Sequence, residues 1–180
     1  VIFDYHGATD FKFAGGNFDL GEWQIGHFDG STWFVDASFA EAITSNVDYS
    51  VEVLIENATA TLSVGTTEKT TFNFAAQLNN GQIGLGSHDS HTIFDNLTVK
   101  EAGISATGAS LPHSENFGDG EADFFSVVSG TWMVNFNDRY EVAPGGSDAI
   151  SLIAVAGALP DDTHISSVIR AKATGPSYNG

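Results

Sequence analysis

The chain has 180 residues, of which 42% are hydrophobic and 14 are phenylalanines, so it can bury the core of one ordinary domain. Asp and Glu number 23 against 6 Lys and Arg, which gives a net charge of −17 at pH 7. Such an acidic surface repels nucleic-acid phosphates and anionic membranes, so neither is an expected partner. No apolar stretch approaches the roughly 18 residues that a membrane span needs, and membrane insertion is not expected.

The chain contains no cysteine, which excludes disulfides, thiolate nucleophiles and sulfur metal ligands. A dense acidic surface is best tolerated where salt or divalent cations screen it. Together these features favour an extracellular or cell-surface location, and they make Ca²⁺ a candidate cofactor.

Alternation with a period of two dominates the sequence and predicts many short strands. In chain order the predicted strands cover residues 2–5, 11–14, 23–27, 32–36, 50–56, 58–64, 67–75, 82–86, 92–100, 124–128, 131–135, 139–143, 149–155 and 165–173. Turn signals such as Asp29-Gly30 and Ser129-Gly130 separate them. About a dozen short strands with this spacing predict an all-β fold, either a sandwich or a barrel.

Two segments break the strand pattern. Residues 37–44 (ASFAEAIT) predict one or two turns of helix between strands, too short to be stable alone. Residues 101–110 (EAGISATGAS) are small and polar, and they predict a linker between neighbouring units.

The two ends of the chain fit each other. Residues 162–180 predict a strand and a turn that lead into the strand at residues 1–7. On this interpretation the natural unit begins near residues 111–120 and ends near residues 94–100, so that its second half comes first. The two chain ends are then expected to lie together, as adjoining edges of one sheet.

Several pieces resemble one family when they are taken in this rotated order. They are ENFGDG at residues 115–120, SGTWMVNFNDRYEV at 129–142, HISSVIRAKA at 164–173, FDYHGATDFKFAGG at 3–16, the alternating segment 51–64 and GQIGLGSHDSHTIFDNLTV at 81–99. Together they resemble the LamG-like jelly rolls of the concanavalin A-like lectin/glucanase superfamily. The resemblance implies an antiparallel jelly-roll β-sandwich. Because the pieces match in rotated order, it also allows a circularly permuted domain.

The resemblance also divides the chain. Residues 1–103 correspond to the C-terminal half of a LamG-like sandwich, 104–113 to a linker and 114–180 to the N-terminal half. Either the chain is one permuted domain, or it is a window on a tandem repeat or polymer in which each half pairs with a neighbour's complementary half. A third alternative is that the two parts belong to two different incomplete domains.

Carboxylates near the expected junction of first and last strands form a candidate metal site. In the resemblance these strands are neighbours, which brings Asp119 and Glu121 toward Asp95 and implies a calcium site with the oxygen ligands that Ca²⁺ prefers. The alternative is that Asp119-Gly120 makes a turn and Asp95 caps a bulge.

Aromatic side chains around a predicted hairpin turn form a candidate carbohydrate site. Phe28, Asp29 and Trp33 lie at this turn, and His88 and His91 occupy a second loop. Flat apolar faces of sugar rings pack on aromatic rings. The alternatives are that the aromatics belong to the core, as expected for Trp132, and that the histidines are solvated. With Asp89 the two histidines would make a poor zinc site, because a third anchored ligand is missing.

Catalysis is not expected. Glycoside hydrolysis needs a pair of facing carboxylates, and the Glu-x-Asp-x-x-Glu motif of the superfamily's glucanases is absent. The sequence therefore favours a non-catalytic structural or adhesive repeat module of an extracellular bacterial surface or fibre-forming protein, with neighbouring copies of itself or adjacent repeats as partners. The alternative is a lectin-like carbohydrate-binding domain whose partners are glycans.

Overall fold

The computed structural model describes residues 1–101, 112–143, 148–155 and 159–172, which form 15 strands in two antiparallel sheets. The predicted all-β antiparallel sandwich is confirmed, and the described residues contain one strand, at His113–Glu115, that none of the predicted ranges covers. Nothing in these ranges is a helix of the length and apolarity that crossing a membrane requires.

The strands are short, and most coincide with predicted segments. In chain order they are β1 (Ile2–Gly7), β2 (Asp10–Asn17), β3 (Glu22–Phe28), β4 (Trp33–Ala40), β5 (Tyr49–Glu56), β6 (Thr59–Val64), β7 (Thr67–Asn73), β8 (Gln82–Ser87), β9 (Thr92–Glu101), β10 (His113–Glu115), β11 (Phe125–Ser129), β12 (Trp132–Val134), β13 (Tyr140–Val142), β14 (Ala149–Ile153) and β15 (Asp162–Ala171).

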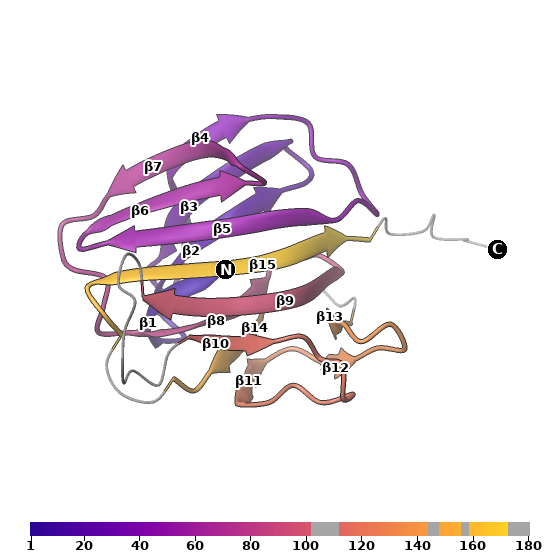
Figure 1. Ribbon diagram of the computed structural model, residues 1–180. Coiled ribbons are helices and arrows are strands. Elements are labelled where there is room, and N and C mark those ends of the chain that lie inside the picture. Colours follow the sequence, from indigo (N-terminus) through magenta and orange to yellow (C-terminus); the bar gives the residue numbers. More distant parts are fainter. Residues whose placement is uncertain (102–111, 144–147, 156–158, 173–180) are drawn as a thin grey trace.

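The two sheets stack as layers (Figure 1). The seven-stranded sheet has the order β11-β14-β8-β1-β2-β3-β4. The eight-stranded sheet, which lies in front in Figure 1, has the order β12-β13-β9-β15-β5-β6-β7, and β10 pairs with β9 beside this path. Each sheet therefore combines strands from the beginning and the end of the sequence.

Alternation along the strands builds the main core between the layers. On β5, Val51, Val53 and Ile55 are buried, whereas the residues between them are partly buried. The main core joins these side chains to Phe3, Trp23, Ile25, Leu62, Ile83, Leu85, Leu97, Val99, Phe117 and Ile165, among others. Each such buried side chain contributes roughly 1.5–3 kcal/mol to folding.

A second apolar group lies on the outer face of the seven-stranded sheet. It consists of Ile2, Tyr5, Phe11, Ile150 and Leu152, with Phe13, Phe28 and Trp33 packed against it, and we call it the outer aromatic cluster. Its position follows from the period of two, because Ile2 and Leu152 are direct neighbours of Phe3 and Ile153, which point into the main core.

A glycine is required where the outer aromatic cluster approaches the backbone. A side chain at Gly26 would have its Cβ 2.0 Å from the carbonyl oxygen of Phe34 and 2.5 Å from the ring of Phe13. Because Gly26 has no side chain, the ring of Phe13 can lie directly over β3. Aromatic rings can therefore pack closely on the outer face of the sheet.

Two local expectations are wrong. Residues 37–40 are not helical but continue β4, because this part of the strand pairs with β3 at Phe39↔Trp23 and Ala40↔Glu22. His113, placed at the end of the predicted linker, begins strand β10. Most of that linker, residues 104–111, lies outside the described residues.

The expected strand neighbours at the junction are confirmed. β10, just before the GDG turn, pairs antiparallel with β9 of FDNLTV, with His113 opposite Val99 and Glu115 opposite Leu97. The expected meeting of the chain ends in one sheet is wrong, because β1 lies between β8 and β2 whereas β15 lies in the other sheet between β5 and β9. Gly180 is outside the described residues.

The first residue is part of the packed structure. The amino group of Val1 is buried and donates a hydrogen bond to the carbonyl oxygen of Ala14 at 2.8 Å. In a chain that begins at Val1, burial lowers the pKa of this ammonium group from 8.0 to about 5, because the charged form loses its hydration.

Candidate functional site

Three of the predicted carbohydrate-binding residues meet on the outer face of the seven-stranded sheet. Trp33 on β4 lies opposite Phe28 on β3, with 5.1 Å between the ring centroids. His88 follows β8, which is separated from β4 by β1, β2 and β3, yet its ring centroid lies 4.9 Å from that of Trp33. The ring of Trp33 therefore extends over the outer face of the sheet, from β4 to the residue that follows β8.

The outer aromatic cluster holds Trp33 in this position. Phe11 and Phe13 contact its ring at steep angles, with centroid distances of 5.4 and 5.0 Å. Edge-to-face contacts of this kind are favourable by about 0.5–1.5 kcal/mol each beyond the area they bury. Trp33 stays partly exposed, as does Phe28. A supported, partly exposed indole ring is suited to stacking against a flat apolar ligand surface.

The turn between β3 and β4 adds an acceptor next to these rings. The exposed carboxylate of Asp29 accepts hydrogen bonds from the backbone N–H groups of Ser31 and Thr32, both at 2.9 Å. These bonds, together with one from the Ser31 hydroxyl, lower the pKa of Asp29. Asp29 is therefore ionised at neutral pH and can accept hydrogen bonds from a polar ligand.

The two predicted histidines are directed to different places. His88 contacts the carboxylate of Asp148 through Nδ1, and its Nε2 lies 3.5 Å from that of Asp89. His91 forms a hydrogen bond with Glu141 on β13 of the eight-stranded sheet. His88 belongs to the group around Trp33, and the structure does not bring His91 into it.

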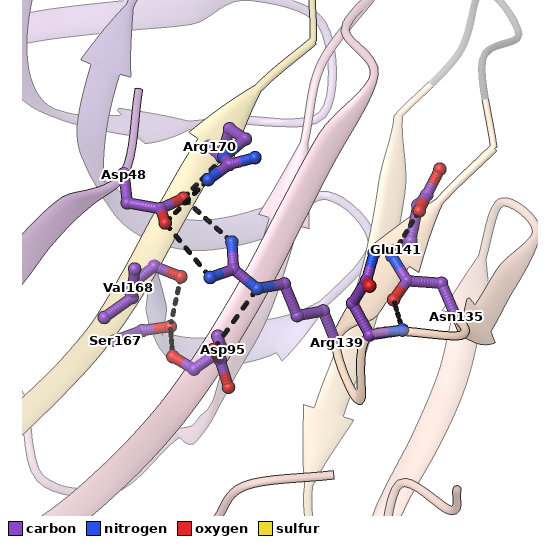
Figure 2. Close-up of polar contacts among 9 residues, drawn as sticks. Asp48, Asp95, Asn135, Arg139, Glu141, Ser167, Val168 and Arg170 are labelled. Carbon is purple, nitrogen blue, oxygen red and sulfur yellow. Dashed lines mark hydrogen bonds and ion pairs between the residues drawn. The ribbon is translucent and has the colours of Figure 1, made fainter. Parts of the chain in front are cut away.

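An ion-pair network on the eight-stranded sheet joins distant parts of the sequence (Figure 2). Arg139 donates to the carboxylate of Asp48 at 2.8 and 3.0 Å, and Arg170 donates to the same carboxylate at 2.6 and 2.7 Å. The hydrogen bonds from the two arginines hold the pKa of Asp48 well below its usual range. Asp95 lies 3.4 Å from Nε of Arg139, and burial raises its pKa.

A second polar group lies beside this network. Burial would raise the pKa of Glu141, but hydrogen bonds from Lys172 at 2.8 Å, from Asn135 at 2.6 Å and from His91 outweigh it and lower the pKa to about 2. Figure 2 shows Glu141 and Asn135 on the side of Arg139 away from Asp48. In both networks, cationic side chains neutralise a partly buried carboxylate, which is Asp48 in the first and Glu141 in the second.

The predicted calcium ligands have other partners. Asp119 accepts a hydrogen bond from the backbone N–H of Glu121 at 3.0 Å, next to Gly120 with φ +84°, which is the predicted alternative of a simple turn. Asp95 faces Arg139. In the described part of the chain, no three His, Cys, Asp or Glu side chains are grouped so that they could hold a metal ion. The calcium site stays a prediction, without a preformed group of ligands.

The structure also reveals polar residues that the sequence did not single out. The buried carboxylate of Glu115 accepts hydrogen bonds from the N–H groups of Phe117 at 2.7 Å and Asp123 at 3.0 Å, and so shapes the GDG loop. Arg139 and Arg170 are the chain's two arginines, and both bind Asp48. The rarity of arginine in so acidic a chain was the signal available for this network.

No protein-family model matches the chain, and no curated protein matches it. The two-sheet antiparallel sandwich is compatible with a jelly roll.

Proposed function

We propose that this protein is a non-catalytic adhesive module of an extracellular bacterial protein and that it adheres by binding carbohydrate. The observation that carries this proposal is the meeting of Phe28, Trp33 and His88 on the outer face of the seven-stranded sheet, at centroid distances of 5.1 and 4.9 Å. The acidic, cysteine-free composition supports the extracellular location.

The chemistry of the face fits a sugar ring. The apolar face of a pyranose would stack on the accessible part of Trp33, while its hydroxyl groups would donate to the ionised carboxylate of Asp29. Stacking on an aromatic ring contributes about 0.5–1.5 kcal/mol, which corresponds to roughly a two- to tenfold change in affinity. Affinity for one sugar is therefore modest, and firm adhesion would come from several modules acting together.

A structural role is the second candidate, favoured by the Asp48 network. The bidentate contacts of Arg139, which immediately precedes β13, and of Arg170 in β15 connect these strands to Asp48, the residue that precedes β5. Cross-links of this kind suit a repeat module that carries load. In this role the partners are neighbouring copies of the chain or adjacent repeats, and glycans are not needed.

The test is binding of the intact chain to a glycan array and to a panel of soluble polysaccharides, followed by tryptophan fluorescence titration with any sugar that binds. We expect Trp33→Ala to weaken binding about two- to tenfold. Trp132→Phe is the matched control, because Trp132 stacks on Phe94 and Tyr140 of the eight-stranded sheet, and it should leave the affinity unchanged.

Two outcomes would contradict the proposal. Unchanged affinity in Trp33→Ala would remove this face from the binding site, and failure to bind any glycan would leave the structural role as the better candidate. Circular dichroism of both variants checks that they fold. Release of reducing sugar from any bound polysaccharide would overturn the non-catalytic assignment.

A further inference from the structure

The strands of the sandwich belong to two interleaved portions of the sequence. The first portion comprises β1–β9 and the second portion comprises β10–β15, and residues 102–112 join them. In the eight-stranded sheet β15 lies between β5 and β9, and in the seven-stranded sheet β14 lies beside β8 (Figure 1). Neither sheet can be completed by one portion alone.

β15 occupies a slot between two strands of the first portion. It pairs with β5 from Asp162↔Glu56 to Ile169↔Tyr49 and with β9 from Thr163↔Glu101 to Ala171↔Thr92. If β15 were removed, the facing backbone groups of β5 and β9 would be unpaired. Unpaired strand edges of this kind recruit another strand, because the backbone N–H and C=O groups must find partners.

Buried side chains pack across this boundary as well as within the second portion. Ile165 and Ile169 of β15 are buried in the main core with Val53 and Leu97 of the first portion. The buried hydroxyl contact between Tyr140 and Ser151 at 2.9 Å lies wholly within the second portion, so that portion also brings its own packed residues.

Charges at the boundary are complementary although both portions are acidic overall. The arginines of the chain are Arg139 and Arg170, both in the second portion, and both bind Asp48 of the first portion (Figure 2). Bidentate arginine contacts fix orientation as well as adding energy. The boundary thus has an apolar centre with oriented ion pairs beside it, which are the features of a specific protein–protein interface.

We propose that the slot between β5 and β9 accepts β15 of a second copy of this chain, so that each sandwich combines the first portion of one copy with the second portion of the other. The contacts are the same whether the portions come from one chain or from two, so the exchange requires no new interface. A short connection gives an effective concentration on the order of millimolar. Exchange between two chains should therefore compete with closure within one chain when the protein concentration is similar to this effective concentration. The proposal goes beyond carbohydrate binding and does not depend on it.

The experiment traps the exchanged pair with a disulfide. Ser50 on β5 and Val168 on β15 are directly opposite each other, and the described chain has no cysteine of its own. Full chains carrying Ser50→Cys and differently sized full chains carrying Val168→Cys are denatured together, refolded at increasing concentration and oxidised. We expect a disulfide-linked heterodimer whose fraction rises with concentration and approaches about one quarter of the correctly folded chains near the millimolar range, because half of the chains are then exchanged and half of the exchanged pairs are mixed.

Two controls make the result decisive. One chain carrying both substitutions should form an internal disulfide at low concentration, which establishes that the two positions can be bridged. A mixture of Ser50→Cys chains with Ser126→Cys chains should give little heterodimer, because Ser126 is on β11 of the other sheet. If the double variant closes internally but the mixed chains never exceed the Ser126→Cys control, the proposal is wrong.

Discussion

The buried amino group of Val1 makes the stability of a chain that begins at this residue depend on pH. Its pKa in the folded state is lowered to about 5 by burial, whereas the unfolded chain has the ordinary value of 8.0. Between these values the unfolded state binds a proton that the folded state does not. Stability is therefore complete above pH 8 and decreases as the pH falls toward 5.

The size of this effect has two limits. A shift of roughly three pKa units corresponds to about 4 kcal/mol at pH 5. Local fraying caps this loss, because Val1 can leave its site at the cost of exposing one valine side chain and losing its hydrogen bond to Ala14, about 2–4 kcal/mol together. We therefore expect the free energy of unfolding to fall by about 2–4 kcal/mol between pH 8 and pH 5.

The assay compares a chain with a free Val1 amino group and the same chain with an Nα-acetyl group, by urea denaturation from pH 5 to pH 8.5. The acetylated nitrogen keeps its N–H but has no charge to titrate. Histidines and carboxylates titrate in both chains, so the difference between the two pH profiles isolates the amino group. Any steric cost of the acetyl group shifts the whole profile and leaves its slope unchanged. Parallel profiles would refute the reasoning.

Two further substitutions test the ion pairs and the close approach of strands. Asp48→Asn should lower the free energy of unfolding by about 1–2 kcal/mol in urea, because two bidentate arginine contacts lose their charged partner, whereas Asp138→Asn at an exposed turn should change it by less than about 0.5 kcal/mol. Gly84→Ala should lower the melting temperature strongly, because its Cβ would lie 2.2 Å from the carbonyl oxygen of Ser151. Gly15→Ala is the control, since nothing lies within 4 Å of a Cβ there, and a similar loss in both glycine variants would contradict the steric argument.

Local pattern was enough to predict most strands and one part of the candidate site. The period of two and the Asp29-Gly30 turn identified β3 and β4, and the same turn indicated Phe28 and Trp33 as candidate surface aromatics. Pairing across the four-residue connection 29–32 is a local property, so the sequence shows it directly. Residues 37–44 were predicted to be helical because alanine and glutamate favour helices, but pairing of residues 37–40 with β3 overrides that propensity.

The pairing of strands that are far apart in the chain could not be predicted from the sequence. The alternation of β15 is satisfied equally well beside any strand with a buried face, so its position between β5 and β9 follows from the whole sandwich and not from its own residues. For the same reason the sequence did not reveal that Arg139 and Arg170 share Asp48, since they are far apart in the chain and meet only after the sheet has formed.

The central place of β15 has a consequence for how the protein is made. During synthesis the first nine strands leave the ribosome well before residues 162–171. Until then β5 and β9 lack the strand that lies between them in the folded sheet, and their facing edges are unpaired. Nascent chains emerge at about 5–20 residues per second, which leaves these edges open for several seconds. In that interval the growing polypeptide is exposed to aggregation, and a chaperone or a slow rate of translation would protect it.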